Sequence, residues 1–186
     1  PSRFCSNMHR ERGFTRPLEV LIYFLPRAPE LTPSASPHPR PYYLFVGRLE
    51  KYKGLQDLLP AFEGPGDYDL LGVGSGGYEP QLRAQAEGME RVRFAGWVSQ
   101  ESIGPYYKHA LAVCAPSVTY ETFGLVVIES YARRTPVIAR RLGSLPEVIE
   151  DGRGGLVFSD QRELRAHLDL LARDEALRER LGRQGF

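Results

Sequence analysis

Two glutamates eight residues apart, Glu121 and Glu129, stand at the two ends of the stretch ETFGLVVIE. A helix that begins near Gly124 would point the backbone N–H groups of residues 123–125 out of its first turn, where they and the helix dipole suit an anionic phosphate. At 3.6 residues per turn, eight residues separate two side chains by about 80°, so both carboxylates can face one cleft. Carboxylates accept hydrogen bonds from vicinal hydroxyl pairs. The pattern therefore predicts a ligand with hydroxyl-rich groups on both sides of a phosphate.

Two cations that suit a diphosphate occur in the segment GRLEKYKG, residues 47–54, directly after a predicted strand. Gly47 lets the chain turn close to a ligand, and Arg48 and Lys53 place two positive charges over the same crevice. The simpler alternative is that these cations, like the two glutamates, are solvated charges, as such residues usually are. Convergence of all four charges and the Phe-Gly turn on one crevice favours binding. The implied ligand is of the type sugar–diphosphate–ribose.

A third feature, GVGSGG at residues 72–77, formally matches the dinucleotide fingerprint G-x-G-x-x-G. That fingerprint follows the first strand of a βαβ unit. An acidic residue about 20 residues later lies at the end of the second strand. Here the segment follows the second strand, and Glu90 precedes a strand. We therefore expect a glycine turn that lines the cleft, and no second cofactor site.

The elements that must position these residues are short strands alternating with helices. Strands are expected at 42–46, 69–73, 92–96, 111–115, 136–139 and 155–158. Helices are expected at about 54–63, from 79, at 100–109 with Ser99 as its cap, at 125–133, after a capping box at 144–147, and twice over the helically spaced leucines of 164–181. This alternation predicts an α/β, Rossmann-like parallel sheet with helices on both faces. Its ligand should lie at the carboxyl ends of the strands.

The front of the chain reads differently. A helix-like segment at 3–12 and a strand at 18–25 precede residues 26–41, which contain six prolines and so exclude a helix or a central strand. This composition divides the chain into a front piece, 1–25, a Pro-rich linker, 26–41, and the α/β domain, 42–186. The front piece reads like the end of a preceding domain.

Composition excludes several classes of protein. Hydrophobic residues make up 42% and charged residues 25% of the 186 residues, which is typical of a folded globular chain. A net charge of +1 argues against a nucleic-acid partner. Cys5 and Cys114 offer no disulfide framework, which fits a reducing, cytoplasmic compartment. The longest apolar run, residues 20–25, is too short to span a membrane. The four histidines show no metal-ligand spacing, so we expect no metal.

The order and spacing of these segments resemble the C-terminal, donor-binding domain of the group 1 family of retaining GT-B glycosyltransferases. The similarity runs from about residue 42 to about 181. It includes GRLEKYKG and ETFGLVVIE, and further TPVIA at 135–139, GSLPEVIEDG at 143–152 and GLVF at 155–158. Residues 1–25 look like the end of the family's N-terminal domain, which binds the acceptor. The resemblance is also compatible with a peripheral membrane association through that domain.

The resemblance implies a role for each motif residue. Gly47, Arg48 and Lys53 would hold the donor diphosphate. Glu121 would contact the transferred sugar as the catalytic carboxylate, and Glu129 would bind the ribose. The list is completed by backbone contacts of Phe123, Gly124 and Leu125 to sugar and phosphate, and of Val98 to the base. The family transfers sugar from a nucleotide-diphospho-sugar to an acceptor hydroxyl with retention of configuration, and its fold generally needs no metal or other cofactor.

Some positions depart from the family pattern, and other functions stay open. Arg134 stands where the family often has Gly, Gly143-Ser144 replaces a frequent Gly-Gly, and Arg140 and Arg141 add positive charge near the sugar end. These departures bear on the identity of the sugar. The alternatives are a nucleotide-sugar binding or regulatory module without transferase activity, and another GT-B enzyme such as a sugar-nucleotide epimerase or a phosphorylase.

Overall fold

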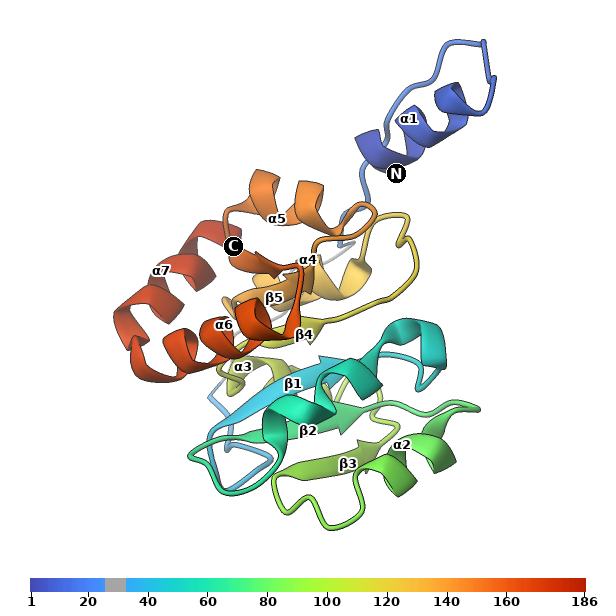
Figure 1. Ribbon diagram of the computed structural model, residues 1–186. Helices are drawn as coiled ribbons and strands as arrows, with labels where there is room; N and C mark the ends of the chain where they lie inside the picture. The colour runs from blue at the N-terminus through green and yellow to red at the C-terminus, as the bar shows by residue number, and fades with distance from the viewer. Residues whose placement is uncertain (26–32) are drawn as a thin grey trace.

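One six-stranded parallel sheet forms the centre of the molecule (Figure 1). The computed structural model describes residues 1–25 and 33–186. The strands are β1 (Tyr42–Val46), β2 (Asp69–Val73), β3 (Val92–Gly96), β4 (Val113–Ala115), β5 (Val137–Arg140) and β6 (Gly155–Phe158), in the order β3-β2-β1-β4-β5-β6. β1 pairs with both β2 and β4. The chain therefore winds outward from β1 in two directions, and the carboxyl ends of β1 and β4 form the switch point where ligands of such sheets bind.

Helical segments cover both faces of this sheet, as the sequence predicts. Side chains alternate along β1, so that Tyr43 and Phe45 enter one apolar cluster while Tyr42 and Leu44 enter the other. The first cluster receives side chains from α2 (Glu79–Gln85), α6 (Gln161–Arg173), α7 (Glu175–Gly185) and the 3₁₀ segments. The second receives them from α3 (Gly104–Lys108), α4 (Leu125–Tyr131) and α5 (Leu145–Gly152). The Rossmann-like fold class is confirmed.

The helix expected at 54–63 is wrong in type. The chain instead forms three 3₁₀ segments, η1 (Lys51–Lys53), η2 (Leu55–Asp57) and η3 (Leu59–Phe62). Gly54 has φ +77°, and a Cβ there would lie 2.1 Å from the carbonyl oxygen of Pro116. This left-handed residue ends η1 and begins η2, which breaks the α-helical hydrogen-bond ladder.

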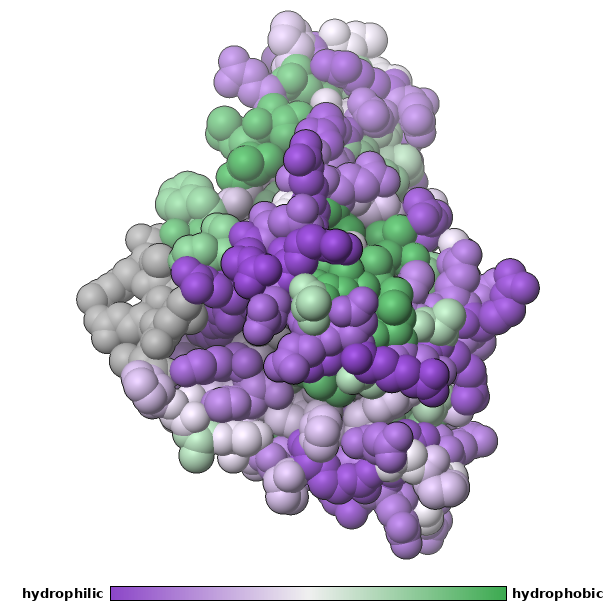
Figure 2. Space-filling model, turned by 90° about the vertical axis from the view of Figure 1, so that its left-hand side faces the viewer, coloured by the Kyte–Doolittle hydropathy of each residue, from purple (hydrophilic) through white to green (hydrophobic). Residues whose placement is uncertain are grey.

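The strand expected at 18–25 is also wrong: no strand is assigned there. A β-strand needs a neighbour to pair with, and the six strands of the sheet pair only with one another. The segment instead leaves Leu21 and Phe24 76% and 78% exposed. Hydrophobic surface is visible in the upper half of the view in Figure 2. Apolar composition alone thus predicted a strand that does not form, because it has no partner within the described part of the chain.

Several boundaries and caps also differ. α3 begins at Gly104 after Ile103, and the Ser99 hydroxyl bonds to that of Ser102 without capping the helix. The capping box at 144–147 does not form. Ser144 Oγ donates to the carbonyl oxygen of Glu121, and Glu147 accepts from two backbone N–H groups of α1 (Arg3–Glu11). The strand at 113–115 and the helix at 125–131 are shorter than expected, and the strand at 137–140 is shifted by one residue.

Contacts of Glu147 and Thr122 hold α1 against the α/β domain. The carboxylate of Glu147 accepts from the backbone N–H groups of Arg3 and Phe4, at 2.7 and 2.8 Å. Ser2, almost fully buried, donates from Oγ to the carbonyl oxygen of Thr122 at 2.7 Å. The predicted helix at 3–12 is therefore present as α1, and its first turn packs on the loop between β4 and α4.

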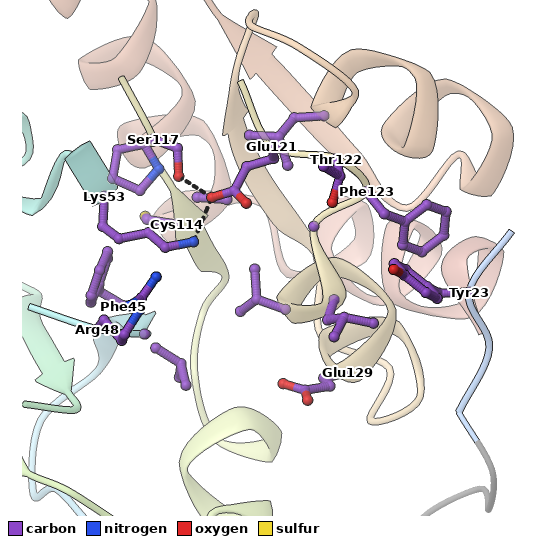
Figure 3. A pocket seen from close by; sticks show the side chains of 18 residues that line it. Tyr23, Phe45, Arg48, Lys53, Cys114, Ser117, Glu121, Thr122, Phe123 and Glu129 are labelled. Atoms are coloured by element: carbon purple, nitrogen blue, oxygen red, sulfur yellow. Dashed lines mark hydrogen bonds and ion pairs between the residues drawn. The ribbon is translucent and has the colours of Figure 1, made fainter. Parts of the chain in front are cut away.

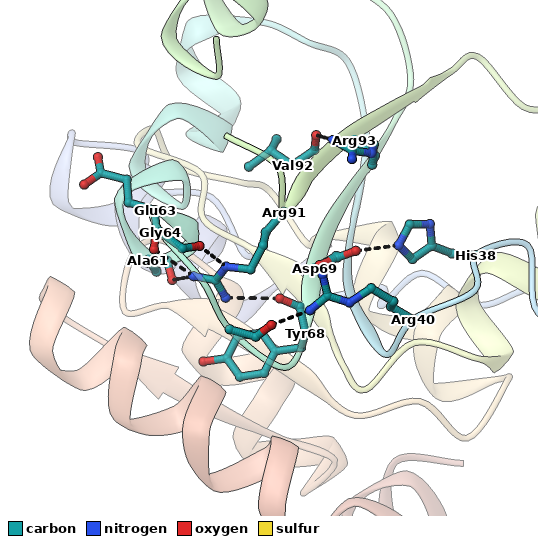
Figure 4. Close-up of polar contacts among 11 residues, drawn as sticks. His38, Arg40, Ala61, Glu63, Gly64, Tyr68, Asp69, Arg91, Val92 and Arg93 are labelled. Atoms are coloured by element: carbon teal, nitrogen blue, oxygen red, sulfur yellow. Dashed lines mark hydrogen bonds and ion pairs between the residues drawn. The ribbon is translucent and has the colours of Figure 1, made fainter. Parts of the chain in front are cut away.

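A polar network lies at the opposite end of the strands from the switch point, at the amino end of β2 (Figure 4). His38 Nε2 lies 2.7 Å from Asp69 Oδ2, and Arg40 lies 3.2 Å from Oδ1 of the same carboxylate. Asp67 and Asp69 have Asp-x-Asp spacing, which the sequence interpretation overlooked, but Asp69 is buried and its carboxylate contacts the side chains of His38 and Arg40. The network fastens the end of the predicted linker, whose residues 26–32 lie outside the described residues.

Candidate functional site

A pocket of about 420 Å³ lies at the carboxyl ends of β1 and β4 (Figure 3). Three stretches of chain contribute most of its lining: the end of β1 and the turn after it, the end of β4, and the loop that enters α4. Of the residues singled out from the sequence, the pocket is lined by Gly47, Arg48, Lys53, Glu121, Phe123, Gly124, Leu125 and Glu129. The expectation that both glutamates and both cations face one cleft is confirmed.

Lys53 and Glu121 form an ion pair inside this pocket. Lys53 Nζ lies 2.6 Å from Glu121 Oε1, and the hydroxyl of Ser117 donates to the same oxygen at 2.6 Å. Both charged side chains are about three-quarters buried, at 25% and 22% exposed. The carboxylate is held between strand end β4 and η1, with its second oxygen directed away from these two donors. Ser117 was missed from the sequence, although a serine just beyond a strand's carboxyl end is a signal that could have found it.

The second cation, Arg48, lies beside the first through a shared aromatic ring. The Arg48 guanidinium is 5.4 Å and the Lys53 ammonium 5.8 Å from the centre of the Tyr52 ring. Cations at this distance from an aromatic face are attracted to its negative quadrupole. The exposed Arg48 and the largely buried Lys53 therefore stay on the same side of the pocket.

The glycine segment at 72–77 does not line the pocket, which corrects the expectation from the sequence. A Cβ at Gly74 would lie 1.9 Å from the carbonyl oxygen of Gly47, and one at Gly76 would lie 2.4 Å from that of Leu49. These glycines let one backbone pass directly against the turn that carries Arg48. Their role is to support the turn.

The loop before α4 presents backbone donors to the pocket. Gly124 is left-handed, with φ +87°, and a Cβ there would lie 2.7 Å from Leu145 Cδ2. Among the described residues, the N–H groups of Phe123, Gly124 and Leu125 have no hydrogen-bond acceptor. The Phe123 side chain is buried and its ring lies edge-on to Tyr23, with centroids 5.5 Å apart. Phe123 is thus available to a ligand mainly through its backbone.

Glu129 faces the pocket from the second turn of α4. Its Oε2 accepts a hydrogen bond of 2.7 Å from the hydroxyl of Tyr107, which lies in α3 and is fully buried. The sequence did not single out Tyr107, because nothing in the local pattern distinguishes it from its neighbour Tyr106.

Comparison with known proteins identifies the family. The family model described as "Glycosyl transferases group 1" matches residues 28–186. The chain belongs to this family.

Individual relatives of this group 1 glycosyltransferase chain carry several names. A phosphatidyl-myo-inositol mannosyltransferase of Mycobacterium leprae is 39% identical over 145 residues, which cover 74% of this chain and 38% of the relative. A glycogen synthase of Thermus thermophilus is 39% identical over 123 residues, covering 63% and 28%. The chain therefore spans well under half of these two relatives.

Solved structures support the same fold. A sucrose-phosphate synthase from Thermosynechococcus elongatus is 31% identical, with a TM-score of 0.72 and coverage of 79% of this chain and 40% of that one. Anabaena HepE in complex with UDP-glucose has a TM-score of 0.72 at 24% identity, covering 79% and 43%. The second likeness concerns the fold alone.

Val98 is not among the residues that line the pocket. It is half-buried and packs against the apolar cluster that contains Tyr107. A contact of its backbone with a nucleotide base stays a prediction.

Two features are absent from residues 1–25 and 33–186. Within these ranges no helix is long and apolar enough to cross a bilayer. The same residues contain no group of three or more His, Cys, Asp or Glu side chains that could hold a metal ion.

Proposed function

We propose that the pocket binds a nucleotide-diphospho-sugar and that this chain is the donor-binding part of a retaining glycosyltransferase. The observation that carries the proposal is the meeting of Arg48, Lys53, Glu121 and Glu129 around one pocket at the switch point of the sheet. The volume of about 420 Å³ lies in the usual range for small-molecule sites.

The chemistry of the lining assigns each part of the donor. The diphosphate would lie between the cations Arg48 and Lys53 and the N–H groups of residues 123–125, since charge-assisted hydrogen bonds are the strong ones. The sugar would lie at Glu121 and the ribose at Glu129, because carboxylates accept hydrogen bonds from hydroxyl groups. The base would extend toward Val98.

The reaction that this arrangement serves is transfer of the sugar to an acceptor hydroxyl. The bond between the anomeric carbon and the diphosphate oxygen breaks, and the acceptor oxygen bonds to the same face of that carbon. The acceptor's proton passes to the departing diphosphate. Arg48, Lys53 and the backbone donors stabilise the charge that develops on this leaving group. The phosphate charge is neutralised by protein groups, so we propose that binding needs no divalent metal.

The acceptor would be held by a preceding domain, so this chain alone should bind donor without transferring sugar. Holding both reactants in place accounts for about 7–11 kcal/mol of barrier lowering in well-oriented reactions. Transfer should therefore need a second domain over the donor.

Calorimetric titration tests the proposal. UDP-, GDP- and ADP-sugars are titrated into the chain with Mg²⁺ and, in parallel, in excess EDTA, with UDP-glucose first because HepE was solved with it. We expect saturable binding of at least one donor that is weakened in Arg48→Ala and Lys53→Ala. The matched control is Lys51→Ala, an exposed lysine two residues from Lys53 that does not line the pocket. Failure of every donor to bind, or binding that EDTA abolishes, would contradict the proposal.

A further inference from the structure

Glu129 receives a hydrogen bond from a buried tyrosine that no motif of the family assigns. Tyr107 is fully buried in α3, and its hydroxyl donates to Glu129 Oε2 at 2.7 Å. In the described part of the chain this is the hydrogen bond that holds the Glu129 carboxylate, because the other contact of this residue is made by its backbone carbonyl. The carboxylate therefore has one oxygen fixed by the protein and the other at the pocket.

The position of the Tyr107 ring is itself fixed from two sides. The guanidinium of Arg133 lies 4.8 Å from the ring centre, and Arg133 also donates to the Glu129 carbonyl oxygen at 2.9 Å. Thr135 Oγ1 donates to the carbonyl oxygen of Tyr107 at 2.8 Å. The hydroxyl thus reaches Glu129 from a ring that cannot move freely.

The direction of this hydrogen bond is also fixed. Burial, and then the neighbouring Glu129 carboxylate, raise the pKa of Tyr107 well above that of an ordinary tyrosine. The hydroxyl consequently remains protonated at neutral pH, and it donates while the carboxylate accepts. Glu129 Oε1 is left to accept from a ligand.

We infer that Tyr107 is a positioning residue that orients Glu129 toward the ribose hydroxyls and so makes the site prefer ribonucleotides. The inference rests on the proposed function, which places ribose at Glu129. A glutamate side chain that is free to rotate loses conformational entropy when it binds, and one already held in a binding orientation loses less. The preference for ribose therefore depends on the Tyr107 hydroxyl.

The test compares ribonucleotides with analogues that lack the hydroxyl pair. UDP, GDP and ADP, and their 2′,3′-dideoxy counterparts, are titrated calorimetrically into the wild-type chain and into Tyr107→Phe. We expect Tyr107→Phe to weaken binding of the ribonucleotide by about 3- to 10-fold, the scale of one hydrogen bond. Binding of the dideoxy analogue should change by less than about 2-fold, because it offers no hydroxyl pair to Glu129. Tyr106→Phe is the matched control, since among the described residues its hydroxyl makes no hydrogen bond.

A second pair of variants isolates the route through Glu129. In a Glu129→Ala background, Tyr107→Phe should cost no further affinity for the ribonucleotide. Glu129→Gln keeps the Tyr107 ring intact and should bind the ribonucleotide as weakly as Glu129→Ala. The reason is that the Tyr107 hydroxyl holds the amide oxygen, which leaves the amide NH₂ at the pocket. This variant tests the inference even if Tyr107→Phe does not fold, which its thermal unfolding midpoint reports.

The contrary results fall into two groups. Equal losses for the ribonucleotide and its dideoxy analogue in Tyr107→Phe, no loss in either, or wild-type affinity in Glu129→Gln would overturn the role of Tyr107 and leave the proposed function standing. If none of the three diphosphates binds the wild-type chain, the proposed function and this inference fail together.

Discussion

Lys53 and Glu121 form a close ion pair, with Nζ 2.6 Å from Oε1, although one is assigned to the donor's diphosphate and the other to its sugar. A lysine ammonium has three N–H donors. One of them can stay on Glu121 while the others meet phosphate oxygens. On the proposed function, the pair would place Glu121 next to the bond that breaks.

Loss of this ammonium should weaken diphosphate binding. Lys53→Ala removes a charge-assisted donor to the phosphate, and we expect donor affinity to fall by about 1–3 kcal/mol. Calorimetry with the tightest-binding nucleoside diphosphate measures the change. Lys51→Ala should leave affinity unchanged. An equal loss in both variants would mean that Lys53 acts only through general charge.

The two glutamates should affect different kinetic constants in a full-length enzyme that includes an acceptor-binding domain. Glu121→Ala should lower mainly kcat, because its proposed contact is to the sugar that moves in the transition state. Glu129→Ala should raise mainly the KM for donor, because the ribose contact is the same before and during transfer. Steady-state kinetics with varied donor distinguish the two. A purely KM effect of Glu121→Ala would contradict the assignment.

The glycine segment at 72–77 supports the turn that carries Arg48, so substitution of Gly74 should lower the stability of the fold. In Gly74→Ala a Cβ would stand 1.9 Å from the Gly47 carbonyl oxygen, at φ +135°. The two backbones must separate, and we expect a loss of roughly 2–3 kcal/mol of unfolding free energy in urea, with weaker diphosphate binding. Gly77→Ala in the same segment is the control, because its Cβ would meet only the Glu50 carboxylate, whose oxygens lie 3.5 and 3.8 Å away. Equal stability of the two variants would refute the close approach.

Cys114 should make the fold sensitive to alkali. Burial raises the pKa of its thiol from 9.0 to about 12. At a pH between these two pKa values, the thiol has lost its proton in the unfolded state and keeps it in the folded state. The free energy of unfolding therefore falls as pH rises. The slope from this one group is at most about 1.4 kcal/mol per pH unit.

The measurement is urea unfolding at pH 8, 9, 10 and 11 for the wild-type chain and Cys114→Ala. The wild type should lose more stability than the variant above pH 9, because Cys114 titrates only in the wild type and, after burial as the larger cause, also raises the pKa of Tyr43. The other buried tyrosines are present in both proteins. Cys5→Ala, which changes a partly exposed cysteine, should follow the wild type. Parallel pH profiles for wild type and Cys114→Ala would contradict the burial argument.

The sequence predicted most of the sheet and the pocket for identifiable reasons. Six short apolar segments between helical patterns required a parallel sheet, and parallel strands bring their carboxyl ends to one edge. This places residues after strands β1 and β4 together, which is why Arg48, Lys53, Glu121 and Glu129 could be assigned to one cleft.

The errors came from interactions between distant residues, which local patterns do not encode. The segment 18–25 has strand composition, but pairing depends on a neighbour. Glu147 has a capping-box position, yet its carboxylate accepts from Arg3 and Phe4, 144 and 143 residues away in sequence. Tyr107 lies 22 residues from Glu129, and only the packing of α3 beside α4 brings its hydroxyl to the carboxylate.

The central claim is that a donor diphosphate binds at the carboxyl ends of β1 and β4. A crystal structure of the chain with its tightest-binding nucleoside diphosphate, grown in EDTA, tests it most directly. We predict phosphate oxygens at about 2.7–3.2 Å from Lys53 Nζ and from backbone N–H groups of residues 123–125, with the ribose hydroxyls at Glu129. A nucleotide bound elsewhere, such as beside Arg83 and Arg93 in the pocket near β3, would contradict the claim.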